Sequence, residues 1–172
     1  TATSENICHR EMFLLEEGVE NLEYSNYDLE NIAIFCDPNY NEPDNVAQLF
    51  RGEYSMLRRC LYGREIFDLV FDFGYQFLEQ YKDERKFLRL GFMEGHEGIL
   101  ESIKYIDNSL YKFLLYFIEK HFTSNSAIII ASDHGENMIS IPYILGDPGF
   151  LYERTLGTLF LLLPNNIDKN FY

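Results

Sequence analysis

The chain has 172 residues, of which 47% are hydrophobic, so it is long enough and apolar enough for one compact domain with a core. Its 28 acidic residues against 14 Lys and Arg give a net charge of −14, which argues against binding to a nucleic-acid backbone. No apolar run reaches the ~18 residues that span a bilayer, so we expect no transmembrane segment. The chain opens on Thr1 without a signal peptide, and we expect a processed chain or a piece of a longer protein.

Residues 1–62 are the least regular part of the sequence, rich in Asn, Asp, Glu and Tyr. Weak patterns predict short helices around Arg10–Glu17 and Asp44–Arg51 and an isolated strand near Ile32–Phe35. The segment Cys36–Pro43 is a turn-rich loop. No element is predicted before Arg10.

The cysteines leave the compartment open, because they have no CxxC spacing and are far apart: Cys8, Cys36 and Cys60. One disulfide with a free thiol would fit an extracellular or lumenal setting, whereas three buried thiols would fit the cytosol. We expect the extracellular or lumenal setting.

Residues 63–164 carry the pattern of an α/β core. Apolar residues at helical spacing predict a helix over Ile66–Tyr81, and a strand-like run follows at Phe87–Met93. A long helix is predicted over Gly98–His121, with an apolar stripe opposite Glu101, Lys104, Asp107 and Lys112. An apolar strand is predicted at Ala127–Ser132. Its continuous run of β-forming residues, flanked by polar residues, is typical of a strand that is covered on both faces. A loop containing Gly146–Gly149 then leads to a third strand, Leu156–Leu163.

The succession of strand, helix and strand predicts a βαβ unit with parallel strands. Its two strands are followed by His96 and by Asp133 with His134, which should therefore emerge at the same edge of the sheet, where α/β proteins place their ligands. A carboxylate and a neutral imidazole suit Zn²⁺, Mn²⁺ or a similar divalent ion. Nearby glutamates are further candidates for ligands or bases: Glu94, Glu97 and Glu136. The alternative is that Asp133 caps a turn and that the histidines are ordinary surface residues.

These residues resemble the carboxyl-terminal half of the alkaline phosphatase/sulfatase superfamily core. The resemblance depends on Ser132–Gly135 after an apolar strand, on Gly95–Gly98 before a helix that carries Asp107, and on Glu153 before the strand that ends at Pro164. Within the superfamily, the chain is most similar to the sulfatase-like group named DUF229. Further matching stretches are Asn6–Glu11, Cys36–Tyr40, Arg58–Gly63, Tyr81–Asp83 and Lys86–Leu90.

The resemblance implies a single, partial domain over residues 1–172, with a largely parallel sheet and helices on both of its faces. It also implies hydrolysis or transfer of phosphate or sulfate esters with a divalent ion (Zn, Mn, Mg or Ca). Asp133 and His134 would bind one ion, and His96 would bind an ion or contact the substrate. In several branches of the superfamily an Asp four residues before this histidine is another ligand, and here the position is Phe92.

The family's nucleophile lies upstream of the matched stretch and its last metal-binding histidine lies downstream, so we expect the chain to associate with a missing amino-terminal part of its own domain. An alternative function is a non-catalytic sulfatase-like domain that serves as an ectodomain or as a subunit of a larger assembly. A flavodoxin-like or dinucleotide-binding module is a weaker alternative, because no GxGxxG or GxxxxGK follows any predicted strand.

Overall fold

The computed structural model describes residues 1–6, 27–31, 33–36, 59–95, 101–120, 126–135 and 148–164. The chain divides into two compact units, Thr1–Glu94 and Gly95–Tyr172, each of which is described by itself below. The helices predicted around Arg10–Glu17 and Asp44–Arg51 lie outside the described residues.

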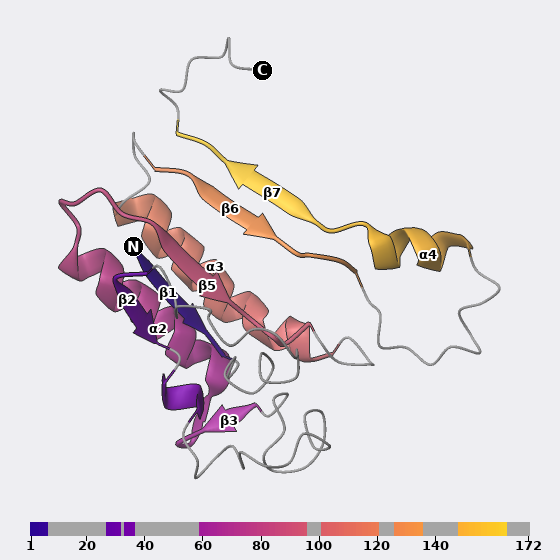
Figure 1. The fold of residues 1–172 in the computed structure, drawn as a ribbon, viewed down its shortest axis with the longest axis horizontal. Helices are drawn as coiled ribbons and strands as arrows, with labels where there is room; N and C mark the ends of the chain where they lie inside the picture. Colours follow the sequence, from indigo (N-terminus) through magenta and orange to yellow (C-terminus); the bar gives the residue numbers. More distant parts are fainter. Residues whose placement is uncertain are drawn as a thin grey trace, which may run out of the picture. The chain divides into compact units, whose positions relative to one another are not determined.

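The first unit contains a three-stranded parallel sheet with β1 (Ala2–Glu5) in its centre (Figure 1). β2 (Leu29–Asn31) pairs with one edge of β1 and β5 (Leu88–Gly91) with the other. Every residue of β1 is buried, although three of the four are polar. The strand is therefore central in space, whereas its sequence predicts no element. β5 confirms the strand predicted over Phe87–Met93.

The strand predicted near Ile32–Phe35 is wrong: the strand lies earlier in the chain, and a short helix occupies most of the predicted range. β2 ends at Asn31, where Ser4 and Asn31 are the last paired residues, and residues 33–36 form a short 3₁₀ helix, η1 (Ala33–Cys36). Leaving the sheet here turns the side chain of Phe35 into the core, where it is buried. Burial of this aromatic ring thus outweighs the β-forming composition of the segment.

A short hairpin precedes the first helix. β3 (Cys60–Leu61) and β4 (Arg64–Glu65) pair in an antiparallel fashion, and Tyr62 and Gly63 connect them with φ angles of 53° and 74°. Positive φ at both central residues is the signature of a type I′ turn, for which Gly63 carries no steric penalty. The hairpin fixes the entry to the helix, because the N–H of Ile66 donates to the carbonyl of Arg59.

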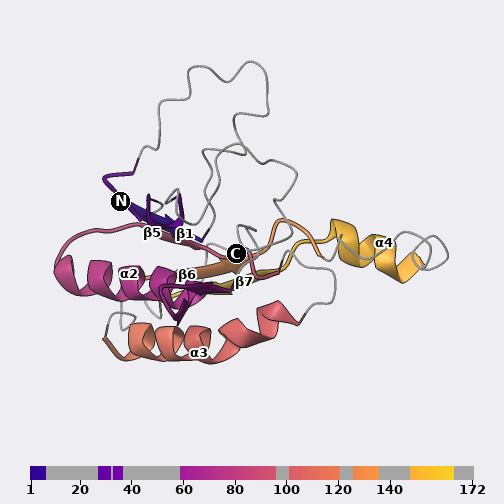
Figure 2. The same ribbon diagram turned by 90° about the horizontal axis from the view of Figure 1, so that it is seen from below.

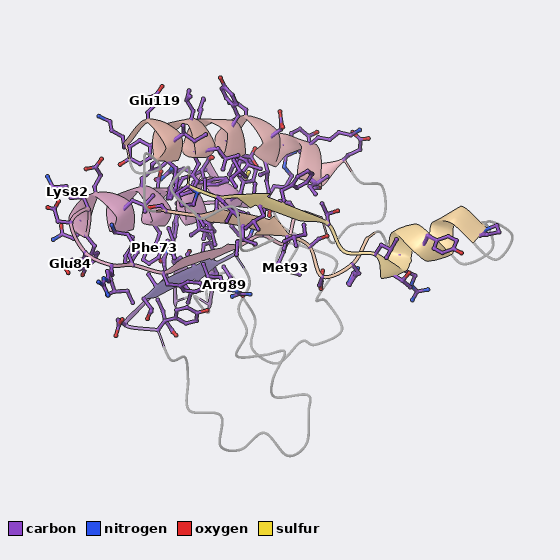
Figure 3. The ribbon with its side chains drawn as sticks, turned by 90° about the horizontal axis from the view of Figure 1, so that it is seen from above. Phe73, Lys82, Glu84, Arg89, Met93 and Glu119 are labelled. Carbon is purple, nitrogen blue, oxygen red and sulfur yellow. The ribbon has the colours of Figure 1, made fainter. Side chains whose placement is uncertain are left out.

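Helix α2 (Ile66–Gln80) confirms the helix predicted over Ile66–Tyr81 and packs along the sheet formed by β1 and β5 (Figure 2). It ends where the N–H of Tyr81 bonds to the carbonyl of Phe77. The charged turn that follows carries Lys82 and Glu84 at the end of the helix (Figure 3). One face of α2 supplies most of the core of this unit; its buried residues are Ile66, Phe67, Val70, Phe71, Gly74, Phe77 and Leu78.

The second unit contains the predicted long helix, α3 (Ser102–Lys120), and two strands that pair antiparallel, β6 (Ile128–Ala131) and β7 (Leu159–Leu162). These elements confirm the helix and both strands predicted from the sequence, and the residues predicted opposite the apolar stripe of α3 are exposed. The segment around Pro148 is not only a loop: a helix, α4 (Pro148–Thr155), begins there. Proline is favoured in a first helical turn, where its missing N–H needs no partner.

Burial of β6 on both faces, as the sequence predicts, is wrong for the structure, in which Ile129 is 65% exposed. In the described part of the chain β6 pairs with β7 alone, and its burial alternates: Ile129 and Ala131 are exposed, whereas Ile128 and Ile130 are half-buried. β5 and β6 belong to different units and different sheets, so the parallel βαβ unit stays a prediction. Among the helices that the structure describes, none is long and apolar enough to cross a membrane.

Candidate metal centre

Asp133 and His134 lie in the bend that follows β6. The backbone N–H of His134 donates to Asp133 Oδ1 over 2.9 Å, which fixes the carboxylate against the turn. The Asp133 side chain is 86% exposed, while His134 is half-buried. The bend therefore presents a carboxylate to solvent beside an imidazole whose position is more restricted.

The contacts of the imidazole define which nitrogen carries its proton. His134 Nδ1 lies 2.6 Å from the carbonyl oxygen of Gly135. A carbonyl oxygen only accepts hydrogen bonds, so Nδ1 is the protonated nitrogen and, in the neutral ring, Nε2 carries the lone pair. Nε2 lies 3.5 Å from Asp133 Oδ2. In the neutral ring, a nitrogen with a lone pair thus lies beside a carboxylate oxygen.

This arrangement fits two ligands of one divalent ion. Zinc–nitrogen and zinc–oxygen bonds near 2.1 Å with a tetrahedral angle place the two donor atoms about 3.4 Å apart, close to the 3.5 Å between His134 Nε2 and Asp133 Oδ2. Histidine ligands also commonly donate their second ring N–H to a carbonyl or a carboxylate, as His134 does to Gly135. The donor set and its support are therefore suited to a metal ion.

The positions of the remaining predicted site residues relative to this pair stay a prediction. His96, Glu97 and Glu136 lie outside the described residues, and Glu94 belongs to the first unit. Among the residues described, no group of three or more His, Cys, Asp and Glu side chains is placed to hold a metal ion. The full ligand set consequently stays a prediction, and two of its members have defined geometry.

Glu94 lies just beyond the carboxyl end of β5 and takes part in a buried polar contact with β1. The side chain of Asn6, which follows β1 directly, donates from Nδ2 to Glu94 Oε1 over 2.5 Å. Asn6 Oδ1 accepts the backbone N–H of Met93 over 2.9 Å. One amide thus ties together the ends of two parallel strands, at the edge where sheets of this type bind ligands. Met93 marks this end of the segment in Figure 3.

Burial raises the pKa of Glu94 above its ordinary value of 4.5, and the hydrogen bond from Asn6 opposes part of that increase. The charge of Glu65 adds to the increase. Glu94 is only 8% exposed, and within the described ranges its Oε2 atom has no hydrogen-bond partner. The sheet edge of the first unit thus holds a desolvated carboxyl group.

Asn6 belongs to the matching stretch Asn6–Glu11, but the hydropathy pattern of the sequence gives it no structural role. The signal available for it is weak: a polar run from Thr3 to Asn6 has neither alternation nor an apolar core that would indicate a strand. Only the pairing of β1 between β2 and β5 shows that this run is buried.

Phe92 occupies the position at which several branches of the resembled superfamily have a ligand. Its ring packs against Phe71 of α2, with ring centroids 4.8 Å apart. It is also one of the partly buried residues around the core cluster that includes Phe35 and Val70. Phe92 is therefore a packing residue.

Together, these features define an α/β protein with a small parallel sheet and a candidate carboxylate–imidazole metal centre in its second unit. The profile of one protein family of unknown function, DUF229, matches residues 46–172, which is more than half of the chain. The chain therefore belongs to the DUF229 family, as its motifs predict. No curated protein and no solved structure matches it significantly.

Proposed function

We propose that this chain contributes a divalent-metal site to a hydrolase of phosphate or sulfate esters. The observation that supports this proposal most directly is the pair formed by His134 Nε2 and Asp133 Oδ2, 3.5 Å apart, with the ring proton held on Nδ1 by the carbonyl of Gly135. We assign Asp133 and His134 as ligands of one ion and His96 as a further ligand or a contact to the substrate's oxygens. Glu94 and Glu97 are candidate additional ligands.

A divalent ion in such a centre would supply a Lewis acid that polarises a phosphoryl or sulfuryl oxygen. The chain's own residues would bind the ion and hold its ligands in the correct orientation. Asp133 supplies negative charge at an exposed position that a substrate can reach. Gly135 keeps the lone pair of the imidazole on Nε2, and the backbone N–H of His134 holds the carboxylate in place. We assign no nucleophile within this chain and place the protein in an extracellular or lumenal setting.

The test is the metal content of the full-length protein, measured by inductively coupled plasma mass spectrometry, together with turnover of p-nitrophenyl phosphate and p-nitrophenyl sulfate. Asp133→Ala and His134→Ala should each lower metal affinity on the order of 10-fold or more and reduce turnover accordingly, because each removes a ligand. Asp83→Ala, which changes an exposed aspartate in the turn after α2, is the matched control and should leave both measurements unchanged. Unchanged metal content in Asp133→Ala and His134→Ala would exclude the proposal.

A second candidate is a non-catalytic sulfatase-like domain that acts as an ectodomain or as a subunit. The observation that favours it is Phe92, which packs on Phe71 at a position where some relatives of the resembled superfamily place a ligand. A protein that has lost one ligand can retain its fold without turnover. Absence of both bound metal and turnover in the full-length protein would support this candidate, whereas metal with turnover would support the first.

A further inference from the structure

The ladder between β6 and β7 continues past both strands into the candidate metal centre. Ala131 pairs with Leu159, so the next residues along, Ser132 and Thr158, face each other. The N–H of Ser132 donates to the carbonyl of Thr158 over 2.9 Å. In the opposite direction, the N–H of Thr158 donates to the hydroxyl Oγ of Ser132 over 2.7 Å. A side chain thus accepts one of the two hydrogen bonds at the last rung, directly before Asp133.

Gly157 lies across from Asp133 in the same register. A Cβ atom at this position would be 2.4 Å from the carbonyl oxygen of Ser132 and 3.1 Å from that of Asp133. Both obstacles are backbone atoms, which no rotamer change can move. A side chain at position 157 would therefore displace the segment that carries the carboxylate of Asp133.

We propose that Ser132 and Gly157 are positioning residues for the metal centre, which hold the Asp133–His134 bend so that its carboxylate and imidazole face one ion. The presence of the ion in this inference rests on the proposed function, whereas the restraint on the bend rests on the observed geometry. The distance between His134 Nε2 and Asp133 Oδ2 depends on a backbone that follows directly from the last rung. Displacement of that backbone would misplace the two donors, because metal–ligand distances tolerate only about 0.2 Å.

A role in the stability of the ribbon alone is the competing explanation, and Thr158 separates the two. Its contribution to the last rung is its backbone N–H, and its side chain is exposed. Thr158→Ala therefore keeps both hydrogen bonds of the rung, whereas Ser132→Ala removes the acceptor for one of them. Ser132→Thr retains a hydroxyl at the position and serves as the conservative rescue.

The experiment uses the full-length protein and two readouts. The first is the affinity for Co²⁺ or Mn²⁺, followed by the visible spectrum of bound Co²⁺, which reports the geometry of the ligands. The second, in metal-free protein, is the ¹⁵N chemical shift of the His134 ring nitrogens, which reports whether the proton is on Nδ1. We expect Gly157→Ala and Ser132→Ala to weaken metal affinity about 10-fold and to alter the tautomer signal, while Thr158→Ala and Ser132→Thr resemble the unaltered protein.

The two readouts keep this inference separate from the proposed function. If Asp133→Ala leaves metal affinity unchanged, the metal assignment fails, yet a tautomer signal altered by Ser132→Ala and Gly157→Ala would still support the positioning role. If Asp133→Ala abolishes binding while Gly157→Ala and Ser132→Ala match the unaltered protein in both readouts, the positioning role is wrong. Should Gly157→Ala fail to fold, Ser132→Ala decides, because it adds no atoms.

Discussion

A single amide, that of Asn6, connects residues that are 88 positions apart in the sequence. Its carbonyl oxygen and its amino group are both used, one by the backbone of Met93 and the other by the carboxyl group of Glu94. Asn6 is only 4% exposed, so loss of these bonds would leave buried polar atoms without partners. The end of β5 is thereby fixed relative to the end of β1, and the chain continues from there toward His96.

Glu94 should make the stability of the protein depend on pH. Burial raises its pKa in the folded chain, so the folded state binds the proton more tightly than the unfolded chain does. The resulting stability is complete below the ordinary pKa of 4.5 and is lost as the pH rises through the higher folded value. We expect the free energy of unfolding to fall with pH across this window, and to fall less in Glu94→Gln, which keeps an acceptor for Asn6.

Urea unfolding at a series of pH values above and below 4.5 measures this dependence. Glu84→Gln is the control, because Glu84 is exposed in the turn after α2 and its replacement should leave the pH profile of the unaltered protein in place. An identical pH profile for the unaltered protein and Glu94→Gln would show that Glu94 does not bind its proton more tightly on folding.

The residues of the candidate centre differ in how far the sequence reveals them. Asp133 and His134 follow a clear apolar strand, and their chemistry is apparent from their types and their position. The role of Gly135 as an acceptor for the ring is not apparent, because any residue supplies a carbonyl. The role of Gly157 is not apparent from the sequence either. A side chain there is excluded by the backbone of Ser132, which lies 25 positions upstream.

At the scale of elements, helical periodicity was sufficient to predict α2 and α3, because a 3.6-residue stripe needs only local sequence. The strands β5, β6 and β7 were predictable from apolar runs. β1 was not, because its polar residues are buried by pairing with β2 and β5 on either side. The hairpin of β3 and β4 lacks the usual Asn-Gly or Asp-Gly signal and instead uses Tyr62 before Gly63.

Helix α2 should be the element on which the first unit depends most. Phe71 is 2% exposed and packs against Phe92, which joins the helix to the segment after β5. Phe71→Ala removes most of a buried ring and should lower the free energy of unfolding by about 3–5 kcal/mol. Phe73→Ala, on the same helix at a partly exposed position, should cost clearly less. Chemical denaturation followed by far-ultraviolet circular dichroism measures both, and equal losses would contradict this account of the helix.

At the scale of the whole chain, the sequence gives the net charge and the number of cysteines, but it does not show which cysteines are buried or which charges are paired. Cys60 is a free, exposed thiol, which does not fit the alternative of three buried thiols. The side chains of Cys8 and Cys36 lie outside the described residues. The net charge of −14 is large. Among the described residues, exposed side chains form ion pairs such as Arg64–Asp72 at 2.7 Å and Lys104–Glu101 at 2.5 Å. Exposed pairs of this kind offset little of the repulsion among excess carboxylates.

The excess charge leads to a prediction that separates general screening from specific binding of a cation. Repulsion among like charges destabilises a compact state, so NaCl should raise the urea midpoint of unfolding as the Debye length falls to about 10 Å near 0.1 M salt. MnCl₂ at the same ionic strength should raise it further, because an ion that binds only the folded state adds about 2.7 kcal/mol at 100 times its Kd. The full-length protein is the sample for both titrations.

Asp133→Asn distinguishes screening from specific binding. It removes only one of many negative charges, but it removes one of the few ligands of the proposed ion. The response to NaCl should persist almost unchanged, since a single exposed carboxylate contributes little to a net charge of −14. The additional stabilisation by MnCl₂ should be lost, since the imidazole of His134 would no longer have a carboxylate beside its Nε2. If Mn²⁺ and Na⁺ stabilise the unaltered protein equally at matched ionic strength, the acidity of the chain acts only through screening and the candidate centre binds no ion.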